Sequence, residues 1–163
     1  MPDMLVKLYE LPPLEPALDH ATRAGVGVRR ASVLDREAVV AWVRKKFPSW
    51  VAETETAFCH QPVTCFIAQR ERVVVGFACY DATCPNFFGP TAVDQNERGK
   101  GIGHALLLAA LHAQRAQGYA YSIIGGVGPA EYYAKAVGAV LIEGSSPGIY
   151  AGRFPPLNSR DTT

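Results

Sequence analysis

The segment from Val93 to Leu107 reads VDQNERGKGIGHALL. It leaves an apolar run, turns through alternating glycines and enters an apolar pattern with helical spacing. The backbone N–H groups of such a turn, together with the positive end of the helix dipole, bind phosphate or pyrophosphate. Glycines let the backbone approach the anion, and Arg98 and Lys100 add positive charge. The segment therefore predicts an anion site, although glycines also occur in strand-to-helix turns for their geometry alone.

Two common phosphate-binding motifs are absent from the sequence. The P-loop pattern G-x-x-x-x-G-K-S/T does not occur, which excludes that class of nucleotide-binding protein. The dinucleotide pattern G-x-G-x-x-G would need a glycine where His104 stands. A Rossmann-type oxidoreductase is therefore disfavoured.

Composition limits the other classes of function. The chain has 163 residues, 16 Lys and Arg against 15 Asp and Glu, and 48% hydrophobic residues, which fits one globular domain. The net charge of +1 excludes general attraction to polyanions, so we expect neither nucleic acid nor membrane as a partner. Because no signal peptide and no membrane-spanning apolar run is evident, we expect a cytoplasmic protein. The four cysteines form no C-x-x-C pair and are expected to be reduced thiols rather than metal ligands.

The remaining patterns predict an arm, one domain and a tail. Residues 1–25 carry Pro12, Pro13 and Pro16 and are expected to form an N-terminal arm with a short strand over Leu5–Leu8, while residues 155–163 are expected to form a mobile tail. Between them, residues 26–154 form the domain. Strands are expected over residues 26–31, 63–69, 72–80, 87–94, 119–124, 139–143 and 149–154, and helices over residues 32–47, 49–58, 101–117 and 129–137. This order predicts an α/β (α+β) fold with helices packed on a mixed sheet.

At the glycine turn the sequence resembles the GNAT superfamily, the acyl-CoA-dependent N-acyltransferases. The run Arg98-Gly99-Lys100-Gly101-Ile102-Gly103 fits that family's Q/R-x-x-G-x-G/A motif. The expected elements from Val26 to Phe154 follow the order of the GNAT fold, and Tyr132 and Tyr133 stand where that family has a late tyrosine helix. The resemblance implies a mostly antiparallel central sheet, flanked by helices, with splayed central strands. It also implies acetyl-CoA as co-substrate, no metal, and acetyl transfer to a primary amine by direct attack.

The resemblance further implies how acyl-CoA is held. The pantetheine arm would enter between residues 91–94 and 122–125 and pair with backbone groups of Val93 and Gln95. A backbone N–H of Val93 or Ala92 would lie near the oxyanion. The second glycine group, residues 125–128 with Gly126, stands where many relatives have asparagine, so its backbone replaces that residue or leaves room for a bulky acceptor. The pyrophosphate would be held by Arg98, Gly99, Lys100, Gly101, Ile102, Gly103 and His104.

Two neighbouring tyrosines are candidates for the general acid. By the resemblance, Tyr133 is expected both to contact the co-substrate and to protonate the leaving thiolate. A phenol with a pKa of about 10 can donate to a thiol with a pKa of about 8.5 without severe tuning. Tyr132 is the rival, because four residues separate Tyr133 from Gly138 where the family usually has three. Either tyrosine could instead serve packing alone.

The general base is less defined by the sequence. Asp81 is the first candidate, because it ends the third expected strand of the domain beside the expected cleft. The rivals are Glu53 and Glu55 on the second helix and Asp94 at the end of the next strand. Each is equally explained as a solvated carboxylate. A proton path is needed because an amine with a pKa of about 10 is mostly protonated at neutral pH.

The sequence does not identify the acceptor. In this family the acceptor is usually contacted by the final hairpin, here residues 145–150, and by the segment between the first two strands, here with Trp42, Phe47, Trp50 and Phe58. Aromatic residues at helical spacing also form ordinary core. No acidic cluster indicates a polycationic acceptor, so a small-molecule or peptide amine is expected. Many members of the family form homodimers, and no pattern here identifies an interface. The alternative function is a CoA-binding or sensing module of the same fold without catalysis.

Overall fold

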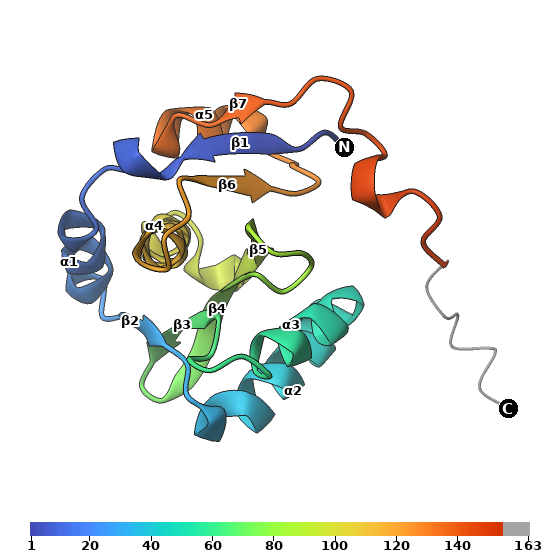
Figure 1. Cartoon of the computed structure of the whole chain (residues 1–163). Helices are drawn as coiled ribbons and strands as arrows, with labels where there is room; N and C mark the ends of the chain where they lie inside the picture. Colours follow the sequence, from blue (N-terminus) through green and yellow to red (C-terminus); the bar gives the residue numbers. More distant parts are fainter. Residues whose placement is uncertain (155–163) are drawn as a thin grey trace, which may run out of the picture.

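The computed structural model describes residues 1–154, which form a single seven-stranded sheet flanked by helices (Figure 1). The strand order is β2-β3-β4-β5-β6-β1-β7, and every neighbouring pair is antiparallel except β5 and β6. This mixed, mostly antiparallel sheet confirms the predicted fold class. The strands are β1 Met4–Lys7, β2 Gly27–Arg30, β3 Cys65–Arg70, β4 Val73–Tyr80, β5 Phe87–Val93, β6 Tyr121–Ile124 and β7 Val140–Leu141.

Five α-helices and five short 3-10 helices connect these strands within the described residues. The α-helices are α1 Glu15–Arg23, α2 Arg36–Lys46, α3 Val51–Ala57, α4 Ile102–Ala116 and α5 Ala130–Val137. The 3-10 helices are η1 Leu8–Glu10, η2 Val33–Asp35, η3 Pro48–Trp50, η4 Gln95–Glu97 and η5 Gly148–Tyr150. The expected tail over residues 155–163 lies outside the described residues.

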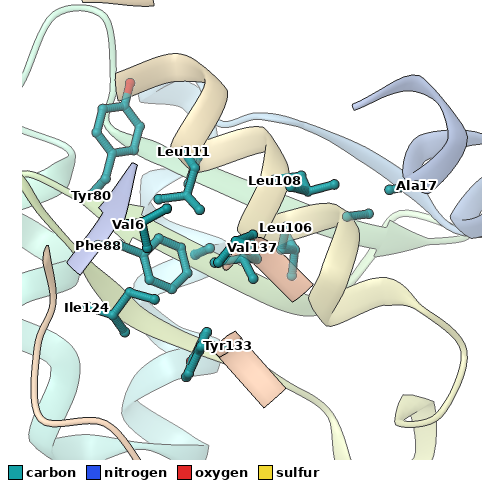
Figure 2. Close-up of a cluster of buried hydrophobic side chains, with 14 of the residues drawn as sticks. Val6, Ala17, Tyr80, Phe88, Leu106, Leu108, Leu111, Ile124, Tyr133 and Val137 are labelled. Atoms are coloured by element: carbon teal, nitrogen blue, oxygen red, sulfur yellow. The ribbon is translucent and has the colours of Figure 1, made fainter. Parts of the chain in front are cut away.

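Helix α4 runs through the main hydrophobic core. Its side chains Leu106, Leu107, Leu108 and Leu111 are each at most 1% exposed. Figure 2 shows three of these leucines in the same buried cluster as Phe88 of β5. Complete burial of one leucine side chain contributes about 1.5–3 kcal/mol relative to exposure. The helix is therefore firmly held, and its first turn has a fixed position beside the end of β5.

A second core lies between the sheet and the α2–α3 pair. Val39 and Val43 of α2 are fully buried there with Phe77 of β4. Trp50 packs against this core, and its ring stacks on Phe47 at a centroid distance of 5.2 Å. Because this core holds α3 in place, the residues on the face of α3 that points away from the core have defined positions. Phe58 is buried in the same core, and Trp42 and Phe47 pack against it, so these three expected acceptor residues serve packing.

The N-terminal residues belong to the sheet instead of forming a separate arm. β1 lies between β6 and β7, and its pairing with β6 runs from Met4 opposite Ile124 to Lys7 opposite Tyr121 (Figure 1). α1 then packs against α4 through the buried Ala17 and Ala21. The short strand predicted near Leu5 is confirmed. Its place in the interior of the sheet was not predicted.

The last predicted strand, over residues 149–154, is wrong. This segment contains the end of η5 and then a turn. Gly148 and Gly152 have φ values of 56° and 75°, which an extended strand cannot adopt. The position beside β6 is already filled by β1. The C-terminal segment therefore lies beside the sheet, where it forms one wall of a cavity.

The only parallel strand pair of the described sheet is short, with two paired positions, as many as β1 has with β7. β5 meets β6 at Phe87 opposite Ile123 and at Phe88 opposite Ile124. Beyond this point β5 continues to Val93, and no strand of the described chain pairs with that edge. The bend begins at Gly89, whose φ of 121° is in the region that favours glycine. Beyond Gly89, β5 is therefore paired on its β4 side only.

Residues 1–154 lack two features. No helix in this part of the chain is long and apolar enough to cross a membrane. Residues 1–154 contain no group of three or more His, Cys, Asp and Glu side chains placed to hold a metal ion.

Candidate active site

Two cavities adjoin each other where β5 and β6 diverge. The turn-side cavity, of about 500 Å³, is lined by the turn before α4, by the end of β5 and by α5. The α3-side cavity, of about 660 Å³, is lined by α3, by the loop after β6 and by the C-terminal segment. Four residues line both cavities: Phe88, Thr91, Pro129 and Tyr133. Molecules bound in the two cavities would therefore meet beside these residues.

The turn between η4 and α4 has the geometry of an anion site. Gly99 and Gly101 have φ values of 77° and 74°, in the left-handed region. The first backbone amide bonded inside the helix is that of Ala105, at 3.1 Å from the Gly101 carbonyl oxygen. The amides of residues 102–104 precede it, so they have no partner within the helix. They point out of the helix N-terminus beside the turn-side cavity, which residues 101–104 all line.

Gly101 also lies close to α1. A Cβ atom at this position would overlap the ring of His20. Burial, and to a lesser extent the nearby His20, lower the pKa of His104 on the first turn of α4. His104 is therefore neutral at pH 7. It can contribute hydrogen bonds to this site.

The two cations of the turn have different surroundings. Lys100 is bound by Glu97, with Nζ 2.9 Å from Oε2, and Arg70 of β3 binds the same carboxylate at 2.9 and 3.1 Å. Arg70 and then Lys100 lower the pKa of Glu97 to about 2. Arg98 has no carboxylate partner among the described residues, and its Nε lies 3.4 Å from the Val93 carbonyl oxygen. Arg98 is thus the cation available to an anion, whereas the charge of Lys100 is already paired.

The free edge of β5 exposes the backbone groups of alternate residues. The Asp94 amide donates to Val75 of β4 at 2.8 Å, so the amide two residues earlier, that of Ala92, also faces β4. The amides of Thr91 and Val93 then face the gap between β5 and β6. Of the two expected oxyanion donors, the structure therefore directs Val93 toward the cavity and Ala92 away from it.

The two tyrosines of α5 differ in their access to the site. Tyr133 is 9% exposed and lines both cavities, and its ring meets Phe88 edge to face at 6.5 Å. Tyr132 is 40% exposed and lines only the turn-side cavity. Burial raises the pKa of Tyr133, and burial and then Tyr133 raise the pKa of Tyr132 to about 12. Both phenols are protonated at neutral pH, but only Tyr133 stands where the cavities meet.

Asp81 is not brought into the site. Its Oδ1 accepts hydrogen bonds from the Asn86 amide at 2.7 Å and from Gln114 Nε2 at 3.3 Å. Gln114 also accepts at 2.7 Å from Ser122, and both of these side chains are fully buried. Asp81 lines neither cavity. This carboxylate instead ties the connection between β4 and β5 to α4, below the point where β5 and β6 separate.

Glu53 of α3 is the one carboxylate that lines the α3-side cavity within the described chain. Thr83 Oγ1 donates to its Oε1 at 2.5 Å, which fixes the side chain. The two other rivals for the base are bound elsewhere. Asp94 pairs with Lys46 at 2.6 Å, and Glu55 lies on the outer surface near two arginines at 3.7 and 4.0 Å.

The loop after β6 is held by the N-terminal segment. The Gly126 amide donates to Asp3 Oδ1 at 2.8 Å, and the Val127 amide donates to the Pro2 carbonyl oxygen at 2.9 Å. A Cβ atom at Gly125 would overlap the Tyr150 hydroxyl, so this glycine leaves room for the C-terminal wall. Gly126 lines the α3-side cavity only. No local motif announced the roles of Asp3 and Tyr150, because both depend on contacts between distant segments.

The predicted co-substrate residues mostly line one cavity. Gln95 and Lys100 do not line it, and Gly126 lies on the other side. The turn-side cavity brings together Ala92, Val93, Arg98, Gly99, Gly101, Ile102, Gly103, His104 and Tyr133.

Comparisons with known proteins agree with this fold. Residues 61–137 match the sequence model of the acetyltransferase (GNAT) domain. A glucosamine N-acetyltransferase region of a fungal multi-domain β-N-acetylglucosaminidase is 14% identical with a TM-score of 0.71, and the match covers 86% of this chain and 19% of that one. A GCN5-related N-acetyltransferase from Sphaerobacter thermophilus is 20% identical with a TM-score of 0.65, covering 86% of this chain and 48% of that one. At these identities the likeness shows the fold. No curated protein matches the chain.

Proposed function

We propose that this chain, which carries a domain of the GNAT superfamily over residues 61–137, transfers an acetyl group from acetyl-CoA to a primary amine. The observation that carries the proposal is the meeting of two cavities at Tyr133. One cavity lies at the N-terminus of α4 and along a free strand edge, and the other contains a fixed carboxylate. The chain spans less than half of the two solved relatives described above, so the donor and the acceptor are both part of the proposal.

The turn-side cavity fits acyl-CoA as a substrate. The free amides of residues 102–104 and the guanidinium of Arg98 suit the pyrophosphate. The unpaired edge of β5 at Thr91 and Val93 can bond the amides of the pantetheine arm in the manner of an added strand. This arrangement would bring the thioester to the junction of the two cavities.

Each side of the junction then supplies one proton transfer. In the α3-side cavity Glu53 binds the acceptor ammonium and takes up its proton, so that the nitrogen lone pair can attack the thioester carbon. The new C–N bond forms as the C–S bond breaks. Tyr133 donates its hydroxyl proton to the departing sulfur, and the Val93 amide stabilises the negative charge on the carbonyl oxygen. The nitrogen passes its second proton to the Tyr133 phenolate, and Glu53 releases the first proton to solvent, so the products are the acetylated amine and CoA with a free thiol.

A panel of amines with acetyl-CoA tests the proposal, with release of free thiol as the measurement. We expect thiol release that depends on both the enzyme and the amine. Stabilisation of the protein by acetyl-CoA without turnover on any amine would favour the non-catalytic CoA-binding module. The absence of any effect of acetyl-CoA on the melting temperature would contradict both functions.

A further inference from the structure

We propose that the acceptor is a small amine that also carries a negative charge, such as a free amino acid with an apolar or aromatic side chain. Glu53 would bind its ammonium group, and Arg153 would bind its carboxylate. The inference rests on the proposed function, because it concerns the second substrate of the same site.

The charges that line the α3-side cavity are the basis of the inference. Among its described lining residues the charged side chains at neutral pH are those of Glu53 and Arg153. The α-ammonium of Met1, which donates to Ser146 Oγ at 3.3 Å, is a second cation. No ion pair within residues 1–154 joins Glu53 to Arg153 or engages Arg153 with another carboxylate. Glu53 receives one hydrogen bond, from Thr83 to Oε1, and no other bond of the described chain involves its second oxygen. Glu53 and Arg153 therefore line the same cavity with opposite charges, and each retains capacity for a ligand.

The charges of Glu53 and Arg153 both affect the pKa of the Tyr150 hydroxyl. Burial is the main cause of its raised pKa, Asp3 and Glu53 raise it further, and Arg153 lowers it. The Arg153 guanidinium lies over the Tyr150 ring at 5.5 Å, which orients the cation at the cavity wall. Because both charges act on the same tyrosine at the cavity wall, we expect a short zwitterion to contact Glu53 and Arg153 together.

The remaining walls suit an apolar body of limited size. The aromatic lining residues are Trp50, Phe88, Tyr133 and Tyr150. At about 660 Å³ the cavity falls in the range of small-molecule sites. The C-terminal segment and the loop after β6 border it, with the Tyr150 hydroxyl packed against Gly125. A cavity of this volume suits a small molecule with an apolar body.

Matched acceptors test the inference without changing the protein. L-Phenylalanine, L-phenylalaninamide and phenethylamine have the same ring and a primary amine, but only the first carries a carboxylate. We expect kcat/KM for phenylalanine to exceed the values for the other two by about tenfold, the effect of roughly one charge-assisted hydrogen-bond pair. Equal values for all three, or a preference for the uncharged amines, would overturn the inference while leaving the acyltransferase function intact.

The variant Arg153→Gln then assigns the effect to one side chain. It should raise KM for phenylalanine about tenfold and change KM for phenylalaninamide less than about twofold. Arg72→Gln, at an exposed arginine in the turn between β3 and β4, is the matched control and should change neither value. An equal effect of Arg153→Gln on both acceptors would contradict the assigned role. If no amine gives thiol release although acetyl-CoA binds, the proposed function and this inference both fail.

Discussion

The two cavities of the site differ in how the chain builds them. The turn-side cavity draws its anion-binding groups from one continuous segment, residues 93–104, whose glycines and following helix are visible in the sequence. The α3-side cavity is assembled from α3, the β4–β5 connection, the loop after β6 and the C-terminal segment. The difference teaches that binding groups supplied by backbone geometry can be predicted locally. Groups supplied by side chains from distant segments depend on the complete fold.

The largest expected effect is on the turn side, from Gly101→Glu. Acetyl-CoA at about 100 times its Kd should stabilise the wild-type protein by about 2.7 kcal/mol, which raises the melting temperature by several degrees. The variant should lose this shift completely. The left-handed backbone at this position disfavours any side chain, and glutamate would also overlap His20 and place a negative charge where the pyrophosphate is proposed to bind. Thermal unfolding with and without acetyl-CoA is the measurement.

A matched control separates loss of the site from loss of the fold. Gly118 has a φ of 99° at the other end of α4, and a Cβ atom there would contact nothing within 4 Å. Gly118→Glu therefore has comparable backbone strain without touching the site, and it should keep the full acetyl-CoA shift. A folded Gly101→Glu protein that is still stabilised by acetyl-CoA would show that the turn does not bind the anion.

The second effect concerns the junction of the two cavities. Tyr133→Phe should lower kcat by about 10²-fold, because it removes the proton donor for the leaving thiolate. The Kd for acetyl-CoA should stay nearly constant, since the ring still packs against Phe88. Tyr132→Phe is the matched control on the same helix and should change kcat less than about threefold. Equal losses in both variants, measured by thiol release at saturating substrates, would refute the assignment of the acid to Tyr133.

The third effect should be confined to the α3 side. Glu53→Gln should lower kcat/KM for the amine by about tenfold or more and leave the Kd for acetyl-CoA unchanged, because this carboxylate lines only the α3-side cavity. Glu55→Gln, two residues along the same helix, removes a carboxylate that faces solvent and should have no effect. A change in acetyl-CoA affinity in Glu53→Gln would mean that the two cavities are not independent.

The fold could be predicted from the sequence wherever local patterns decide it. β3, β4 and β5 lie within two residues of their predicted bounds, because β-branched runs and the turn around Glu71 are local signals. The position of β1 between β6 and β7 could not be predicted, since pairing over more than a hundred residues leaves no local trace. The segment after Pro147 has a strand-like composition, but its left-handed glycines and the occupied position beside β6 prevent it from pairing.

The residues of the candidate site could likewise be predicted only where a local motif or the order of elements places them. Arg98, Gly101 and Tyr133 occupy the places that the motif and the order of elements implied. Asp81 was favoured as the base from its position at a strand end, and the sequence could not show that Gln114 and the Asn86 amide would bind its carboxylate. The charge cluster of Lys100, Glu97 and Arg70 was not predicted either, because Arg70 reaches Glu97 from β3, which is distant in the sequence.

The smallest expected effect tests the cluster of Arg70, Glu97 and Lys100, which lies beside the turn before α4. The pKa of Glu97 in the folded protein is about 2, against an ordinary value of 4.5. A carboxyl group whose pKa is lowered by folding contributes stability that is fully present above its unfolded pKa. That contribution is lost as the pH falls from about 4.5 through about 2. The melting temperature of wild type minus that of Glu97→Gln should therefore be constant above about pH 5.5 and shrink below about pH 4.5.

The effect should be modest and should decrease with salt, because the three charged groups lie near the surface. Glu10→Gln removes a more exposed pair with Lys7 and is the matched control, for which a smaller change with pH is expected. A difference between wild type and Glu97→Gln that stays constant down to about pH 3 would show that Arg70 and Lys100 do not hold the charged form. The turn would then owe its geometry to the glycines and to the packing of α4 alone, and the two cavities would differ less in electrostatics than their residues suggest.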